Sequence, residues 1–184
     1  MRIISGRYKS RRLKGPPVAG IRPTSDKLKE TIFNVVGTEI EGSIFLDGCA
    51  GTGGIGVEAL SRGAQMVYFI EQSSKACRII HENLRSLEIQ DGYKILEMDL
   101  IKGIDRCVRE GVHFDIAFLD PPYEREDLHH TALGHLAAAP PGLLIIEHSK
   151  RKDLPDFACG LQKIRSLVQG DARLAFYRRV RGPE

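Results

Sequence analysis

The 184-residue sequence predicts an α/β fold, in which a mainly parallel sheet is covered by helices on both faces and closed by an antiparallel hairpin. From Ser43 to Glu147, short apolar segments typical of buried strands alternate with amphipathic segments typical of helices. Two of the apolar segments run into loops rich in glycine or proline. The C-terminal part adds two strand-like segments around Gly170-Asp171, which predict the closing hairpin.

The elements follow a regular order after a basic N-terminal arm. Residues 1–22 alternate basic residues with glycine and proline, which predicts a hairpin or an extended arm. Thr24 or Ser25 then caps a helix that ends at Gly37, packs on the body and carries the arm. Strands are predicted at 44–47, 66–71, 93–98, 114–119, 143–147, 161–168 and 173–180, and further helices at 55–62, 74–87, 100–109 and 129–138.

The composition is that of an ordinary globular chain, with 42% hydrophobic and 28% charged residues, and its length suits one domain with a small appendage. No apolar run approaches the roughly 18 residues of a membrane span, and residues 1–6 lack the apolar core of a secretory signal. We therefore expect a cytoplasmic protein with reduced thiols. Neither the four cysteines nor the six histidines have the spacing of a metal site, so no metal is expected.

The charge is distributed unevenly along the chain. Residues 1–14 contain six basic residues and no acidic one, whereas the whole chain has a net charge of only +3, so the remainder is net −3. A basic arm on a slightly acidic body suggests a polyanionic partner. A terminus that is merely solvated would explain the same run of charge.

A glycine-rich turn follows the first predicted strand of the body. Gly51-Thr52-Gly53-Gly54-Ile55-Gly56 satisfies the pattern G-x-G-x-x-G, and Glu71 lies 20 residues after Gly51, at the end of the next strand. Such glycines let the backbone approach a ligand at the start of a helix. An acid at the end of the second strand can bind a ribose diol in nicotinamide enzymes and in S-adenosylmethionine enzymes alike. A turn with a purely structural role would also satisfy the glycine pattern.

Three further features favour S-adenosylmethionine over a nicotinamide cofactor. Asp47 ends the first strand, where a carboxylate would repel a pyrophosphate but suits an ammonium group. Asp99 closes the third strand, where it can accept a hydrogen bond from an adenine amino group. Asp120-Pro121-Pro122-Tyr123 follows the fourth strand and offers a carboxylate, a carbonyl and an aromatic ring, for which a dehydrogenase has no use. Strands beside a switch point open onto one crevice, so the two loops are expected to share a pocket.

These stretches resemble the bacterial 16S ribosomal RNA guanine-N2 methyltransferases of the RsmD type. The tetrad is the signature of amino-methyltransferases, and the resemblance extends over nearly the whole chain through Arg22-Pro23-Thr24-Ser25-Asp26, the glycine loop and Glu58-Ala59-Leu60-Ser61-Arg62-Gly63-Ala64. It implies a Rossmann-like class I methyltransferase fold with a seven-stranded sheet. Residues 1–38 would be the arm and helix that contact RNA, and 39–184 the catalytic domain. One departure is Gly48-Cys49, where such proteins more often have a larger apolar or aromatic pair.

The resemblance also implies the activity and the partner. The protein would methylate the N2 amine of a guanine, guanine 966, in 16S ribosomal RNA within a partly or fully assembled small subunit, with S-adenosyl-L-methionine as cofactor. It is expected to act as a monomer without a membrane partner. An adenine-N6 DNA methyltransferase shares the tetrad, but the chain has no sizeable target-recognition domain. A non-catalytic ribosome assembly factor with a vestigial pocket and a nicotinamide oxidoreductase also remain open.

The candidate site residues fall into three groups. In catalysis, Asp120 and the carbonyl of Pro121 would hold the protons of the amine, Pro122 would stiffen the loop, and Tyr123 would stack on the base. The predicted cofactor-binding residues are Asp47, Gly48, Ala50, Gly51, Gly53, Glu71, Gln72, Asp99, Leu100 and Asp120. The predicted RNA-binding residues are Arg7, Lys9, Arg11, Arg12, Lys14, Arg22 and Thr24.

Overall fold

The computed structural model describes residues 1–15, 25–122, 127–151, 153–158 and 160–179. Three of the predicted site residues, Arg22, Thr24 and Tyr123, lie outside these ranges, and their assigned roles stay predictions. Within the described residues, no helix is both long and apolar enough to span a membrane.

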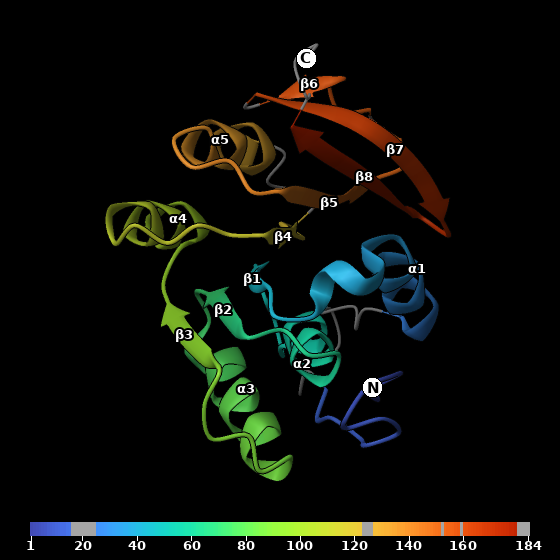
Figure 1. The fold of residues 1–184 in the computed structure, drawn as a ribbon, viewed down its shortest axis with the longest axis vertical. Helices are drawn as coiled ribbons and strands as arrows, with labels where there is room; N and C mark the ends of the chain where they lie inside the picture. The colour runs from blue at the N-terminus through green and yellow to red at the C-terminus, as the bar shows by residue number, and fades with distance from the viewer. Residues whose placement is uncertain (16–24, 123–126, 152, 159, 180–184) are drawn as a thin grey trace.

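The described strands form one sheet of eight strands in the order β3-β2-β1-β4-β5-β8-β7-β6 (Figure 1). Neighbours from β3 to β5 pair in parallel, and the pairs β5–β8, β8–β7 and β7–β6 are antiparallel. The predicted class and closing hairpin are confirmed, whereas the predicted number of seven strands is wrong. The additional strand, β6, has only two residues, which is too short to show an alternating pattern. The strands are β1 (Ile44–Gly48), β2 (Met66–Glu71), β3 (Tyr93–Glu97), β4 (Ile116–Leu119), β5 (Leu143–Ser149), β6 (Phe157–Ala158), β7 (Leu161–Gln169) and β8 (Ala172–Arg179).

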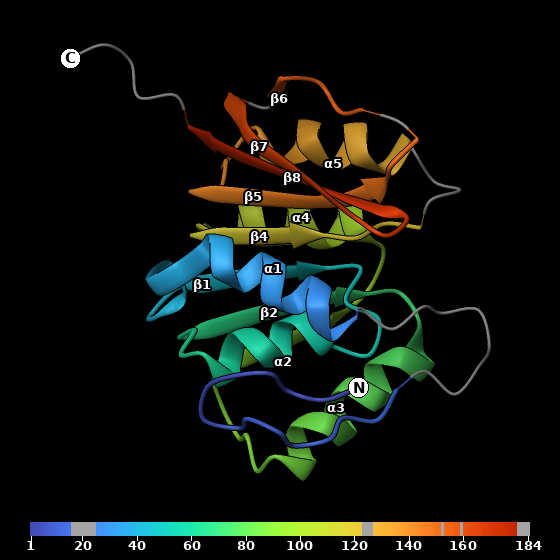
Figure 2. The same ribbon diagram turned by 90° about the vertical axis from the view of Figure 1, so that its right-hand side faces the viewer.

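Helices cover the sheet on both faces. Helices α1 to α3 pack on one face and α4 and α5 on the other, as Figures 1 and 2 show together. All predicted boundaries agree with the structure within two residues, because each segment has a clear apolar period. The helices are α1 (Asp26–Val36), the 3-10 helix η1 (Gly37–Ile40), α2 (Gly54–Ser61), α3 (Ser74–Ser86), α4 (Leu100–Arg109) and α5 (Asp127–Leu136).

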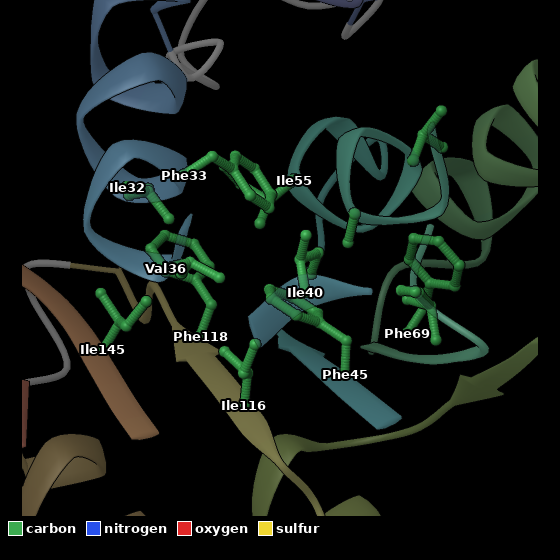
Figure 3. Packing of buried hydrophobic residues seen from close by; sticks show 14 of the residues in the cluster. Ile32, Phe33, Val36, Ile40, Phe45, Ile55, Phe69, Ile116, Phe118 and Ile145 are labelled. Atoms are coloured by element: carbon green, nitrogen blue, oxygen red, sulfur yellow. The ribbon is translucent and has the colours of Figure 1, made fainter. Parts of the chain in front are cut away.

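The core between α1 and the sheet fixes the helix that follows the arm. Ile32 and Phe33 of α1 are buried against Phe45 of β1 and Phe118 of β4 (Figure 3). The rings of Phe33 and Phe45 are stacked, with centroids 6.3 Å apart. Large apolar side chains of this kind each stabilise the fold by about 1.5–3 kcal/mol when fully buried. The expected packing of this helix on the body is confirmed.

The sheet changes winding direction at β1. This strand pairs in parallel with β2 on one side and with β4 on the other, and Leu46 stands opposite both Tyr68 and Ala117. The chain therefore leaves β1 and β4 toward opposite sides of the sheet. Ligands of open α/β sheets bind outside the carboxyl ends of the strands at such a point. The two motif loops, which follow β1 and β4, lie at this position.

The N-terminal arm is a hairpin that belongs to the core. Arg2 and Arg12 form an antiparallel bridge, and Ile3 and Leu13 are buried in the cluster that contains α2 and α3. Figure 2 shows the arm running across these two helices. The hairpin form is confirmed, and the arm itself also packs on the body. The two apolar residues explain this, because their burial favours a packed arm over a solvated one.

A buried carboxylate, Glu58 of α2, holds the arm in place. Its two oxygens accept hydrogen bonds from the backbone N–H groups of Ile4 (2.8 Å) and Ser5 (3.0 Å). One of them also accepts a bond from Arg62 Nε at 2.8 Å, and the Nζ of buried Lys29 lies 3.9 Å away. Burial lowers the pKa of Lys29, and the charge of Glu58 opposes this shift. Glu58 thus connects the arm, α1 and α2.

We expect Glu58→Ala to destabilise the protein by about 3–5 kcal/mol, because it leaves two backbone donors of the arm without their acceptor and removes the buried carboxylate nearest to the buried charge of Lys29. Glu30→Ala is the matched control, since it removes the same charge from an exposed position of α1. Urea unfolding of both variants measures the difference. Equal midpoints for the two variants would show that the arm is held by its apolar residues alone.

Candidate cofactor and catalytic site

The two motif loops are joined directly at the carboxyl edge of the sheet. The last pair in the register of β1 and β4 is Gly48 with Leu119. One residue further, the backbone N–H of Asp120 donates to the carbonyl of Gly48 at 3.2 Å. The sequence placed these loops in a common pocket, and the structure brings them into hydrogen-bond contact.

Two carboxylates hold the glycine loop in shape. Asp47 Oδ2 accepts a hydrogen bond from the backbone N–H of Gly56 at 2.8 Å, beneath the loop. Glu71 accepts one from Gly51 and one from Ser73, both at 2.8 Å. Asp47 is almost fully buried, so the structure shows it as a support of the loop, while its predicted contact with an ammonium group stays a prediction.

The glycine loop is tightly packed where it faces β2, at Gly56, and open at Gly51. A Cβ atom at Gly56 would come within 2.2 Å of the Phe69 ring, so this position requires glycine where α2 packs against β2. A Cβ atom at Gly51 would meet nothing within 4 Å. Gly51 also has a positive φ of 56°, a conformation that glycine adopts without strain. The loop backbone is therefore open to a ligand beside Glu71.

The four predicted carboxyl groups converge around one residue, Cys49. Burial raises the pKa of its thiol, and four negative charges in its surroundings raise it further. In order of effect, these charges belong to Glu71, Asp120, Asp47 and Asp99. They lie at or just after the carboxyl ends of four different strands, so parallel pairing brings together residues that are up to 73 positions apart in the sequence. Asp99 also caps α4 by accepting a hydrogen bond from Ile101 N at 2.9 Å.

Asp120 has a neighbour that sequence reasoning missed. Burial raises the pKa of Asp120 well above its ordinary value, and the charges of Glu147 and Asp47 raise it further. Glu147 occupies the register position of β5 next to Asp120, one step beyond the pair Leu119 and Ile146. Glu147 looked like an ordinary strand end in the sequence. Its pairing position beside the tetrad is the signal that could have identified it.

The other described site residues differ in how far they are exposed to solvent. Pro121 is buried and Pro122 exposed, which matches a loop that leaves the sheet edge. Leu100 is buried, Gln72 exposed, and Ala50 half-buried. The described residues predicted to bind RNA do not belong to this pocket, because they lie on the arm. They are all exposed: Arg7, Lys9, Arg11, Arg12 and Lys14.

Local packing explains why small residues stand at Gly48-Cys49, where the sequence departs from the RsmD type. A Cβ atom at Gly48 would come within 2.5 Å of Leu119 Cδ2 and 3.0 Å of Leu100 Cδ1. Cys49 has a left-handed φ of 63°, which strains a residue with a side chain. The neighbouring side chains fill the space that a larger residue would occupy, and no liganding group is lost.

The fold and the paired loops define a Rossmann-like methyltransferase of class I. A solved structure from Escherichia coli, described as the candidate methyltransferase yhhF, superposes with a TM-score of 0.85 at 26% identity and covers 98% of this chain and 99% of its own. Residues 1–178 match the family described as Conserved hypothetical protein 95, and the chain belongs to this family.

Curated relatives agree with this assignment. The Bacillus subtilis protein YlbH, described as a candidate rRNA methyltransferase, is 34% identical over 184 residues, which cover 97% of this chain and 99% of YlbH. The Escherichia coli K12 protein named Ribosomal RNA small subunit methyltransferase D is 30% identical, with 97% of this chain and 90% of the relative covered. The resemblance to the RsmD type that the motifs indicated is confirmed.

Asp47→Asn should remove a pH-dependent loss of stability. Burial raises the pKa of Asp47 from 3.8 to about 7, so the folded protein binds this proton more tightly than the unfolded chain does. The resulting stabilisation is complete below roughly pH 4 and is lost as the pH rises through 7, at up to about 1.4 kcal/mol per pH unit. The asparagine keeps an oxygen for the Gly56 N–H.

Urea unfolding at about pH 5 and about pH 8 measures this effect. The difference in the free energy of unfolding, variant minus wild type, should be more positive at the higher pH than at the lower pH. A difference that is constant across this range would mean that Asp47 is already ionised in the folded protein at the lower pH.

Proposed function

We propose that the protein transfers the methyl group of S-adenosyl-L-methionine to the N2 amine of a guanine in 16S ribosomal RNA, guanine 966, during maturation of the small subunit. The observation that carries this proposal is the convergence of the four carboxyl groups around Cys49, next to an open glycine loop. The names of the relatives support ribosomal RNA as the substrate. The choice of the amine and of the nucleotide rests on the resemblance to the RsmD type.

The residues of the glycine-loop side fit the cofactor. Glu71 stands at the open face of Gly51, where its oxygens can accept hydrogen bonds from ribose hydroxyls. Asp99, which follows the neighbouring strand β3 and caps α4, suits the adenine amino group, with Gln72 and Leu100 beside these acids in the sequence. Asp47 contributes negative charge toward the cationic part of the ligand. When bound, the cofactor supplies an electrophilic methyl group on a sulfonium.

The tetrad side prepares the amine for attack. The lone pair of an exocyclic amine is delocalised into the base, so hydrogen-bond acceptors must hold its protons and favour a tetrahedral nitrogen. The carboxylate of Asp120 and the carbonyl of Pro121 are these acceptors in our proposal. Pro122 stiffens the loop because its φ is fixed, and Tyr123 stacks on the base. Orientation of the two reactants supplies most of the rate enhancement.

The charge of the arm supports an RNA partner. Residues 1–38 would contact RNA and residues 39–184 would bind the cofactor and carry the reaction. The five described basic residues of the arm are exposed while its apolar residues are buried, so the arm offers its charge to a partner. We propose the small ribosomal subunit, partly or fully assembled, as that partner and a monomer as the active form.

The direct test is the incorporation of labelled methyl groups. Small subunits from a strain that lacks this protein are incubated with the purified protein and labelled S-adenosyl-L-methionine, and the modified base is mapped. Label at the N2 position of a single guanine is the expected result. Label on adenine of added DNA would assign the protein to the DNA enzymes, and cofactor binding without transfer to any of these substrates would indicate an assembly factor.

Asp120→Ala should reduce methyl transfer by orders of magnitude while the affinity for S-adenosyl-L-methionine changes within a few fold. Asp120→Asn should retain more activity than the alanine variant, because an amide oxygen still accepts a hydrogen bond from the amine. Single-turnover rates and calorimetric affinities measure the two effects separately. An asparagine variant as inactive as the alanine variant would implicate a true base in place of an acceptor.

Glu71→Ala should weaken the binding of S-adenosyl-L-methionine by about 1.5–3 kcal/mol, the range for a lost hydrogen bond to a charged group. The matched control is Glu97→Ala, since Glu97 is exposed and stands opposite Glu71 in the register of β2 and β3. Calorimetry measures both affinities. Equal losses in the two variants would place the ribose away from Glu71.

A further inference from the structure

We infer that the outward face of α3 joins the arm in one RNA-binding surface that leads along the protein to the catalytic pocket. This surface, the basic track, consists of Arg11 and Lys14 of the arm and Lys75, Arg78 and Arg85 of α3. The inference rests on the proposed function, because it takes RNA as the substrate. It adds a helix of the catalytic domain to the arm that was predicted to hold the RNA.

The period of α3 separates its basic residues from its apolar ones. Its buried residues include Ala76, Ile80 and Leu84, which face the sheet. Lys75, Arg78 and Arg85 are exposed on the opposite side. The helix has 13 residues, so this charged side extends over about 20 Å. That length is enough for contact with several consecutive phosphates of one RNA strand.

The arm is fastened to α3 along this same helix. Arg11 Nη2 donates to the carbonyl of Ser86 at 2.8 Å. Three residues later, the backbone N–H of Lys14 donates to Asn83 Oδ1 at 2.8 Å, and Asn83 Nδ2 donates back to the carbonyl of Lys14. The second half of the arm therefore follows α3 from its C-terminal end toward its N-terminal end. These contacts place Arg11 and Lys14 of the arm beside the last turn of α3, where Arg85 stands.

The only acid on the exposed side of α3 is surrounded by these cations. Lys14 Nζ lies 2.8 Å from Glu82 Oε2. The hydrogen bond and charge of Lys14 lower the pKa of Glu82, and the charges of Arg85 and Arg78 lower it further. Three cations thus lie around one carboxylate, and the excess positive charge is directed to solvent.

The track and the catalytic pocket lie on the same face of the sheet. The side chains of Asp47 and Asp120 share the face of Phe45 and Phe118, and that face is covered by α1, α2, α3 and the arm. The first turn of α3 begins beside the cofactor residue Glu71, whose carboxylate accepts a hydrogen bond from the α3 cap residue Ser73. RNA bound along the track therefore arrives at the pocket on the side where Asp120 points.

Point variants on α3 test the inference better than removal of the arm, because residues 1–14 contain the core residues Ile3 and Leu13. The test variant is Arg78→Ala combined with Arg85→Ala. The control variant is Lys102→Ala combined with Arg109→Ala, which removes the same charge from exposed positions of α4 on the opposite face. Arg85 and Arg109 each stand in the last turn of their helix, so the pairs are also matched in local stability.

The measurement is the affinity for protein-free 16S ribosomal RNA and for small subunits that lack the modification, at several salt concentrations. Loss of two phosphate contacts should reduce the slope of log affinity against log salt by about 1.4–1.8 in the α3 variant. The control should keep the slope of the wild type. Both variants should keep the thermal midpoint and the affinity for S-adenosyl-L-methionine.

Equal slopes for the α3 variant and the α4 control would overturn the inference, even if labelled methyl transfer confirms the proposed activity. A slope that changes only with intact subunits and not with protein-free RNA would also contradict the inference, because the track is proposed to bind RNA by itself. If the wild type showed no methyl transfer but the RNA-binding slopes were as expected, only the proposed function would be contradicted.

Discussion

The parallel pairing of β1 with both β2 and β4 is the constraint on which the site depends. It brings the carboxyl ends of these strands to one edge, so that Asp47, Glu71 and Asp120 approach the same residue, Cys49. Side chains alternate between the two faces of a sheet, and a shift of β4 by one residue would turn Asp120 away from the face of Asp47. The buried contacts of Phe118 on that face, beneath α1, oppose such a shift.

Glu58 performs a comparable role for the arm. A buried carboxylate has a large desolvation cost, which only a nearly complete set of partners offsets. Here the partners are the N–H groups of Ile4 and Ser5 together with Arg62, so the carboxylate is satisfied only when the arm is in place. The basic residues of the arm therefore have fixed positions relative to α2 and α3. A surface that is ordered before binding loses less conformational entropy when it meets a partner.

Much of the fold could be predicted because each strand and helix has its own apolar period. The two loops could be predicted because each motif occupies one continuous stretch of the sequence. What could not be predicted depends on contacts between distant residues. Glu58 belongs to a recognisable stretch, but nothing in that stretch indicates that its carboxylate receives the N–H groups of the arm. Glu147 becomes part of the site only through the register of β5. The two-residue strand β6 forms only because β7 offers it a partner.

The distribution of charge connects the two parts of the surface. The track is basic and the pocket contains several carboxyl groups, so a polyanion is attracted along α3 while its phosphates are repelled at the pocket. A neutral base can enter there. Within the pocket, burial and the neighbouring acids Glu147 and Asp47 raise the pKa of Asp120 and favour its protonated form. A positive charge brought in beside these acids favours the ionised form instead. In the proposed reaction, a bound cationic cofactor would therefore favour the ionised form of Asp120, which is the form that accepts hydrogen bonds.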